Sequence, residues 1–214
     1  FDGITSRHVN AYYSTVVKGL TAKVFRTYLA SSVVSKYLRA HDNIKSESDM
    51  KKLFHAKLAN LDAAKMCNHK RTIPKNFDQT LEKKKNTLND VEKTKPWQKY
   101  EESLKKTQSK IIKTEAQRET QKKQIKKIKT MIKKKKEKHT ERVEKLQLQI
   151  DLTQKTRDYN LGTSLRNYID PRIFQSWTDE VAAEWEKLYT SALQKKFLWV
   201  KSIDSKWSEI SKYY

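Results

Sequence analysis

Residues 122–150 read KKQIKKIKTMIKKKKEKHTERVEKLQLQI, and this stretch decides the fold class. Its apolar residues recur three or four positions apart, at Ile125, Ile128 and Ile132 and again at Val143, Leu146 and Ile150. This spacing places apolar side chains along one stripe of a helix, as in a coiled coil. Lys and Glu fill most positions between them, and the stretch contains no glycine. It therefore predicts a long, basic, amphipathic helix.

The same composition and apolar spacing extend on both sides of this stretch, over residues 76–158. One seam runs through Phe77, Leu81, Leu88 and Val91, and a second through Trp97, Tyr100, Leu104 and Ile111. Pro96 should kink or restart the first arm. We expect two long helices folded back on each other, with the tip at Lys113–Gln121. One long helix that dimerises through the same seam is the alternative. Lys often breaks the stripe, so the pairing should be weak.

The two flanking regions, residues 1–75 and 159–214, contain most of the other apolar residues. Two helical faces are predicted in the first, one formed by Val16, Val17, Leu20, Val24 and Tyr28 and the other by Leu53, Phe54, Leu58, Leu61 and Ala64. Gly19 interrupts the first face, and Pro74 closes the region. In the last region a helix should begin near Pro171. Helical spacing then relates Trp177, Val181, Trp185, Leu188 and Tyr189, and Phe197, Leu198 and Trp199 follow them; we interpret this stripe as packing residues.

The predicted fold is therefore all-α, with a helical lobe at 1–75, an antiparallel coiled coil at 76–158 and a small helical domain at 159–214. Only three Gly and three Pro in 214 residues agree with this fold class. The chain begins with Phe1 and shows no signal peptide, so we expect a piece of a longer protein.

The charge of the chain indicates its partner. Forty-seven Lys and Arg against 25 Asp and Glu give a formal charge of +22, which attracts polyanions. Nucleic acid is favoured over a membrane, because no apolar stretch approaches the roughly 18–20 residues of a spanning helix. The single Cys67 excludes an internal disulfide and is interpreted as a small core residue. No Cys/His cluster has the spacing of a metal site, and we expect no cofactor.

Three short segments carry residues that suit phosphate chemistry: residues 19–28 (GLTAKVFRTY), 67–71 (CNHKR) and 161–172 (LGTSLRNYIDPR). The planar guanidinium of Arg can donate two hydrogen bonds to one phosphate. A His Nε2–H can donate another, and a Tyr hydroxyl is a competent covalent nucleophile once its proton is removed. Taken alone, His69 is better explained as an ordinary partly buried histidine, and Arg26 as a helix-surface residue. Tyr168 is one of ten tyrosines.

All three segments resemble conserved segments of eukaryotic-type DNA topoisomerase IB, and they occur in that family's order. GLTAKVFRTY resembles the segment that carries a catalytic arginine, at Arg26. CNHKR is similar to the family's CNHQR, which places the catalytic histidine at His69. LGTSLRNYIDPR resembles LGTSKxNYxDPR, with Tyr168 on the active-site tyrosine. The Lys-rich stretch between His69 and Tyr168 lies where the family has its coiled-coil linker.

The resemblance implies an ATP- and metal-independent reaction on duplex DNA. Tyr168 would attack a backbone phosphate, form a 3′-phosphotyrosyl bond and free a 5′-hydroxyl, while Arg26 and His69 stabilise the transition state. The broken strand would swivel and then be resealed. Asn167 would lie beside the cleaved base pair, and we expect Arg166, Lys70 and Arg71 to bind DNA. The intact enzyme would be a monomer, nuclear in a eukaryote or on the cytoplasmic chromosome of an archaeon.

This chain also departs from the family pattern. Leu165 replaces the lysine that follows LGTS, and Leu29 replaces an asparagine after the RTY segment. The family's other catalytic arginine and its general-acid lysine lie upstream of the residues present here. Neither Lys23 nor Lys70 is assigned to replace them. The fragment alone is therefore expected to be inactive or nearly so, and its partner is the upstream part of the same enzyme.

Two other functions remain open from the sequence. A tyrosine recombinase uses a related Arg, His and Tyr set, but the long insertion between His69 and Tyr168 argues against it. A non-catalytic basic coiled-coil protein that bridges DNA or binds a partner helix would explain the charge and the heptads. It would leave the three segments unexplained.

Overall fold

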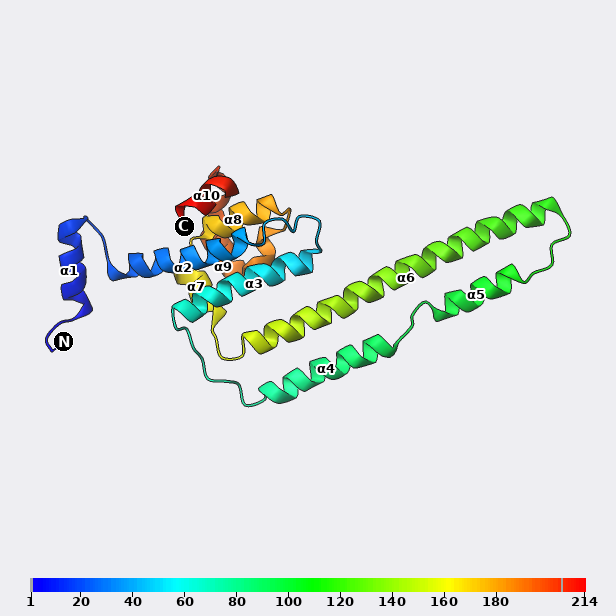
Figure 1. Cartoon of the computed structure of the whole chain (residues 1–214), viewed down its shortest axis with the longest axis horizontal. Coiled ribbons are helices and arrows are strands. Elements are labelled where there is room, and N and C mark those ends of the chain that lie inside the picture. The colour runs from blue at the N-terminus through cyan, green and yellow to red at the C-terminus, as the bar shows by residue number, and fades with distance from the viewer. Residues whose placement is uncertain (1, 205) are drawn as a thin grey trace. The chain divides into compact units, whose positions relative to one another are not determined.

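The computed structural model describes residues 2–204 and 206–214 and is helical in most of them (Figure 1). No strand forms within these residues, and one isolated antiparallel bridge joins Lys70 to Tyr159. The all-α prediction is confirmed. The helices are α1 (Ser6–Val16), α2 (Ala22–Arg39), α3 (Asp49–Met66), α4 (Phe77–Lys93), α5 (Gln98–Gln108), α6 (Glu115–Lys155), α7 (Leu161–Asn167), α8 (Pro171–Glu180), η1 (Trp185–Leu188), α9 (Ser191–Phe197), η2 (Leu198–Ser202) and α10 (Trp207–Tyr213).

The chain divides into two compact units. Unit 1 comprises Phe1–Pro74 together with Leu152–Tyr214, and unit 2 comprises Lys75–Asp151. The two ends of the chain that flank the basic segment thus fold together, although 77 residues of sequence separate Pro74 from Leu152. Within the described residues, no helix is both long enough and apolar enough to cross a membrane.

The core of unit 1 combines small and large residues. Packing between α2 and α3 uses small side chains, with Ala30 and Val34 on one helix and Ala56, Ala59 and Ala63 on the other, all at most 1% exposed. Small side chains allow the two backbones to approach closely. On α3 the buried face is therefore formed largely by alanines, whereas Leu53, Phe54 and Leu58 of the predicted face are only half-buried.

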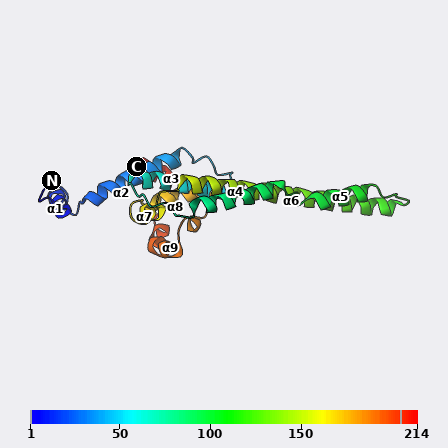
Figure 2. The ribbon, with the colours of Figure 1, turned by 90° about the horizontal axis from the view of Figure 1, so that it is seen from below.

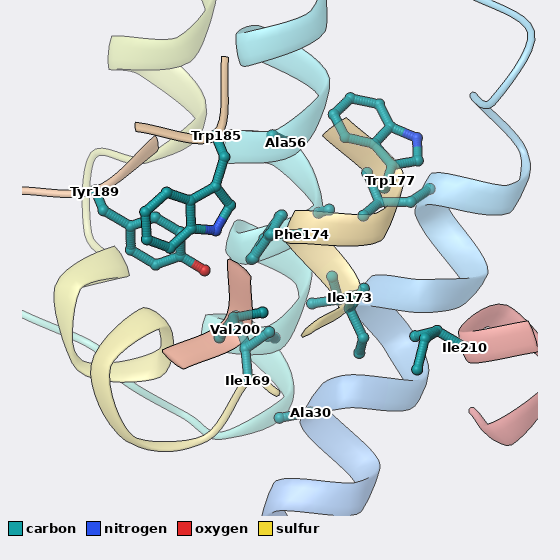
Figure 3. Close-up of a cluster of buried hydrophobic side chains, with 14 of the residues drawn as sticks. Ala30, Ala56, Ile169, Ile173, Phe174, Trp177, Trp185, Tyr189, Val200 and Ile210 are labelled. Atoms are coloured by element: carbon teal, nitrogen blue, oxygen red, sulfur yellow. The ribbon is translucent and has the colours of Figure 1, made fainter. Parts of the chain in front are cut away.

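Aromatic residues of the C-terminal segment fill the other side of this core (Figure 3). Trp177 is fully buried, Trp185 and Tyr189 are nearly so, and their neighbour Phe197 has its ring centroid 5.4 Å from that of Tyr189. The interpretation as packing residues is confirmed for these four aromatic residues, but it is wrong for Leu198 and Trp199, which are 62% and 49% exposed. Helix α8 begins at Pro171 as predicted, but it ends at Glu180, and Trp185 belongs to a separate 3₁₀ turn.

The predicted apolar face near the N-terminus is not buried. Gly19 takes a positive φ of 81° between α1 and α2, so the pattern is split between two helices. Val16, Val17, Val24 and Tyr28 are between 47% and 67% exposed. The Asn10 side chain accepts a hydrogen bond from the Ala22 N–H at 3.0 Å, which caps the first turn of α2. Periodicity predicted the helices here but not what covers their apolar side.

Unit 2 is an antiparallel helical hairpin within one chain, and Figures 1 and 2 both show α4 and α5 alongside α6. Contacts across the pair include Glu92–Gln147, Glu101–Lys136 and the ring of Trp97 against that of His139. The break between α4 and α5 falls at Pro96, as expected. The predicted tip at Lys113–Gln121 is wrong by several residues. The turn spans 109–114, and Glu115–Gln121 already belong to α6.

Burial along the hairpin seam is shallow. Phe77, Val91 and Ile150 are buried, but most other apolar residues of the seam are half-buried. Ile111, which was predicted to continue the seam, is 89% exposed in the turn. This shallow burial agrees with the prediction that Lys residues interrupt the apolar stripe and weaken the pairing of the helices.

Candidate active site

The end of α3 positions His69. Cys67 caps the helix, Asn68 takes a left-handed conformation with a φ of 54°, and the His69 N–H donates to the Ala64 carbonyl at 2.8 Å. The Asn68 N–H donates to the Lys65 carbonyl at 2.9 Å. These two bonds define a Schellman motif, in which Asn occupies the position where glycine is commonest. The CNH sequence therefore ends the helix sharply and fixes the direction of the histidine.

A short backbone pairing joins this segment to the chain before α7. The Asn160 N–H donates to the His69 carbonyl at 2.8 Å, and the Arg71 N–H donates to the Asp158 carbonyl at 2.9 Å. The bridge between Lys70 and Tyr159 lies between these bonds. The pairing brings the histidine segment next to the segment that leads into the tyrosine.

Helix α7 is held to α3 by one buried side chain, that of Asn60. Its amide donates to the Leu161 carbonyl at 3.0 Å, and its oxygen accepts from the Ser164 hydroxyl at 2.7 Å. Ser164 is fully buried, and its carbonyl accepts from the N–H groups of Tyr168 and Ile169. Asn60 thus fixes the helix whose C-cap residue is Tyr168.

The three predicted catalytic residues come together in unit 1. The rings of His69 and Tyr168 have centroids 5.1 Å apart, and the Arg26 guanidinium carbon lies 5.6 Å from the Tyr168 centroid. The Lys23 ammonium, one helical turn before Arg26, lies 5.8 Å from the same centroid. Arg26 and Lys23 are exposed, while His69 and Tyr168 are half-buried. A basic, partly enclosed surface therefore surrounds the tyrosine.

Burial and the Arg26 charge both act on His69. Burial is the larger cause, and together they lower the pKa of this imidazole. Its Nδ1 is buried and has no hydrogen-bond partner among the described residues. A proton on Nδ1 would have no acceptor, so the neutral tautomer with a proton on Nε2 is favoured. Burial also raises the pKa of the Cys67 thiol, which fits its expected place in the core.

The residues after the tyrosine are tied to other helices through Asp170. Its N–H donates to the buried Ser31 hydroxyl at 3.0 Å, and its carboxylate caps α8 and pairs with Arg172. The Tyr214 hydroxyl donates to the same carboxylate at 2.8 Å. Burial opposes ionisation of Asp170, but the bonds from Arg172 and Tyr214 outweigh it, so its pKa is lowered. Burial and the bond to Asp170 raise the pKa of Tyr214 to about 12.

The four predicted DNA-binding residues occupy different settings. Asn167 and Arg166 are exposed at the end of α7, and Lys70 is exposed in the paired segment. The Arg71 guanidinium donates to the carbonyls of Thr156 and Arg157, where it caps the end of α6. This bonding gives Arg71 a structural role that the sequence did not indicate.

The structure explains why a leucine, Leu165, can replace the lysine that follows LGTS in the family. Leu165 is half-buried and packs against the core of unit 1. It also lines a pocket of 280 Å³ with Ala56 and Phe174. Arg166, one position later, is exposed on α7. The positively charged residue of this segment is therefore Arg166, one position after the family's lysine.

Two residues of the site were not predicted from the sequence. Lys23 was set aside, although its spacing of three from Arg26 places both on one helix face. Asn60 was not considered, although a polar residue between Ala59 and Leu61 on a buried face is a recognisable signal. Within the described part of the chain, no three His, Cys, Asp or Glu side chains gather as metal ligands would.

Comparison with known proteins agrees with this arrangement. A family model described as eukaryotic DNA topoisomerase I, catalytic core, matches residues 1–104. A second model, described as C-terminal topoisomerase domain, matches residues 140–209. The chain belongs to the eukaryotic DNA topoisomerase I family, of which it carries C-terminal parts.

Individual relatives share this similarity over nearly the whole chain. DNA topoisomerase 1 of Caenorhabditis elegans is 32% identical over 199 residues, which are 93% of this chain and 22% of the relative. The human protein named DNA topoisomerase I, mitochondrial, is 29% identical over 202 residues, 93% of this chain and 32% of the relative. DNA topoisomerase 1 of the rat is 30% identical over 206 residues, 93% of this chain and 25% of the relative. The chain thus spans between 22% and 32% of these relatives.

Proposed function

We propose that this chain is the part of a type IB DNA topoisomerase that carries the nucleophile and two of its catalytic partners. The observation that carries the proposal is the convergence of Arg26 and His69 on the ring of Tyr168. In sequence, 43 positions separate Arg26 from His69, and 99 separate His69 from Tyr168. Membership of the topoisomerase I family and the charge of +22 support the same function.

In the proposed reaction, the Tyr168 oxygen attacks a backbone phosphorus of duplex DNA. The Tyr168 hydroxyl gives up its proton to solvent, and a bond from its oxygen to the 3′-phosphate forms as the bond to the 5′-oxygen breaks. The general-acid lysine of the upstream part would give the leaving 5′-oxygen its proton. Arg26 and the Nε2–H of His69 donate to the non-bridging oxygens, on which negative charge grows in the transition state. Rotation of the broken strand releases supercoils, and attack by the 5′-hydroxyl restores the bond and the tyrosine.

Further parts of the proposal concern the setting of the reaction. We propose the three regions 1–75, 76–158 and 159–214 as functional domains of a monomeric enzyme. The missing catalytic arginine and lysine would come from the upstream part of that enzyme. The exposed apolar residues Val24, Phe25 and Leu29 beside Arg26 are where this part would pack. The proposed compartment is the nucleus. The mitochondrial relatives make the mitochondrion the alternative, and microscopy of the tagged protein in cells separates the two.

Trapping of a covalent adduct tests the reaction. Full-length protein is incubated with an end-labelled duplex that carries a nick near the cleavage site, in the presence of EDTA, and the products are separated under denaturing conditions. A labelled 3′-phosphotyrosyl adduct should form with the native protein and vanish in Tyr168→Phe. Arg26→Ala and His69→Ala should each slow its formation by about 10²–10³-fold, as expected when one donor to a developing oxyanion is removed.

The outcome also distinguishes the competing functions. Binding of DNA without any adduct would favour the non-catalytic bridging protein, which the basic hairpin of unit 2 supports. An adduct without relaxation of a supercoiled plasmid, but with exchange between two duplexes, would favour a recombinase. The fragment of residues 1–214 alone should form little adduct.

A further inference from the structure

A pocket of 280 Å³ lies within unit 1, where α7 packs against α3. Arg26, His69 and Tyr168 do not line it, so the reaction described above does not use it. Apolar cavities of about 150 Å³ bind benzene, and this pocket is therefore large enough for an apolar ring with a short chain attached. Most of the wall is formed by the apolar side chains of Ala56, Leu152, Leu161, Leu165, Phe174 and Leu188.

The α7 wall of the pocket is apolar because of Leu165. This residue is half-buried against the core of unit 1, at the position where the family has a lysine. A lysine here would bring an ammonium to the wall of the pocket. On α3, the buried Ala56 occupies little space because its side chain is a single methyl group (Figure 3). The apolar character of the pocket is thus partly a property of this chain, which the family's lysine would not give.

Asn60 offers a buried hydrogen-bond donor to this pocket. It is one of the lining residues and is 4% exposed. An Asn side chain has two N–H donors, and one of them donates to the Leu161 carbonyl at 3.0 Å. The other has no acceptor in the described part of the chain. Because a buried donor without a partner destabilises a protein, an acceptor oxygen placed in the pocket would satisfy it.

Lys57 gives the pocket its charge. Among the described residues that line the pocket, it alone is charged, and it is exposed, so it marks the solvent side. Its position three residues before Asn60 places both side chains on one face of α3. The Lys57 ammonium forms no ion pair within residues 2–204 and 206–214. A cation without an acidic neighbour in the pocket wall attracts an anion.

We propose that this pocket binds a small carboxylic acid whose apolar body has the size of one aromatic ring. The ring would pack against Leu165 and Phe174, and the carboxylate would accept from the Asn60 amide and the Lys57 ammonium. A purely apolar ligand would leave the Asn60 donor unpaired, whereas a polyanion would meet mostly apolar walls. The bound acid would contact α3 and α7 together. The proposal goes beyond DNA cleavage and does not require it.

Fluorine NMR with para-(trifluoromethyl)phenylacetate tests the pocket in full-length protein. This probe has one apolar ring and one carboxylate, and its signal should show saturable binding to the native protein. Leu165→Lys should weaken the affinity by more than about tenfold, because a long charged side chain replaces the apolar wall. Arg166→Ala is the control on the same helix: Arg166 is exposed, does not line the pocket, and its loss should leave the affinity unchanged.

The carboxylate is tested separately through Lys57. Lys57→Gln should weaken binding of the probe by about two- to fivefold, the range of an exposed ion pair. Lys65→Gln removes the same charge from an exposed position of α3 that does not line the pocket, and it should have no effect. The corresponding alcohol, in which a hydroxymethyl group replaces the carboxylate, should bind native protein more weakly than the acid and lose no further affinity in Lys57→Gln.

Two results would overturn the proposal. One is the absence of saturable binding to native protein, and the other is equal affinity of the native protein and Leu165→Lys. Equal affinities of the acid and the alcohol would overturn the role of Lys57 and the choice of a carboxylate. Thermal unfolding shows whether Leu165→Lys folds, and Lys57→Gln, a change on the surface, decides the question if it does not. None of these measurements depends on whether the protein forms the covalent adduct.

Discussion

The two units of this chain show how differently helices can be stabilised. Unit 1 buries Trp177, Phe174 and Ile173 almost completely, and the buried polar side chains of Asn60 and Ser164 bond to each other. Unit 2 buries only a narrow seam, to which exposed polar contacts such as Glu101–Lys136 are added. A unit with a deep core can hold side chains in the positions that a reaction requires. A hairpin with a shallow seam provides length and charge but not a rigid site.

The largest effect is expected from the core of unit 1. Trp177→Ala should reduce the free energy of unfolding by about 3–5 kcal/mol, because it leaves a cavity where a fully buried ring was packed. Chemical denaturation followed by circular dichroism measures this loss. A loss near zero would mean that the core around Trp177 is as loosely packed as the hairpin seam.

A smaller effect is expected at Asp170. Asp170→Ala removes the cap of α8 and leaves Arg172 and Tyr214 without their shared partner, which should cost about 1–3 kcal/mol. The folded pKa of Asp170 is lowered, so its contribution is present above the unfolded pKa of about 3.9 and is lost as pH falls through the folded value.

Denaturation of the native protein and of the Asp170→Ala variant between pH 2 and 7 tests this dependence. The difference between the two proteins should be constant near neutral pH and shrink in acid. A difference that grew in acid would contradict the assignment of Asp170 as an ionised partner of Arg172.

The hairpin seam should respond less than the core. Ile128 is half-buried on α6, so Ile128→Ala should cost about 1 kcal/mol, roughly half the value for full burial of an isoleucine. Amide hydrogen exchange detects this change as faster exchange within 75–151, because unit 2 can open without unit 1. Equal acceleration in both units would show that they unfold together and would break the comparison.

The smallest effect is expected from the ion pair between Lys136 and Glu101. Their nitrogen and oxygen are 2.9 Å apart, but the side chains are 50% and 40% exposed. A double-mutant cycle with Lys136→Ala and Glu101→Ala should therefore give a coupling energy of about 0–1 kcal/mol, which high salt reduces further. A coupling much above this range would mean that the pair is shielded from solvent.

Much of the fold could be predicted from the sequence because helices leave local signals. Apolar residues three or four positions apart predicted the helices of unit 2, and Pro96 and Pro171 marked helix boundaries. Trp177, Trp185, Tyr189 and Phe197 were correctly predicted as core, whereas Trp199 was not. The tip was misplaced because polar composition was taken as a turn signal, although Glu and Gln favour helix. The Thr114 hydroxyl accepts from the Gln117 N–H, and T-x-x-Q in the sequence is the pattern of such a helix start.

The site was predictable only in part. Its three residues were chosen by their resemblance to a family, and nothing in helical periodicity indicates that positions 26, 69 and 168 meet. Their meeting depends on long-range bonds, such as those of Asn60 to α7 and of Asn160 to His69. The apolar face predicted near the N-terminus is exposed on α1 and α2, because an apolar stripe does not reveal which partner covers it.

Unit 1 is assembled from two stretches of chain that the hairpin of unit 2 connects. The turn of the hairpin, at 109–114, is remote in sequence from the residues around Tyr168. A cut in this turn would sever no bond within unit 1. Two separate polypeptides, one ending and the other beginning near Ile111, would each contribute residues to the candidate active site, Arg26 and His69 from the first and Tyr168 from the second. The paired arms of the hairpin would then act as the zipper that brings the two halves together, at an effective concentration that neither half reaches by diffusion alone. The fold would therefore allow the two halves of this chain to be encoded by two separate genes and to assemble afterwards.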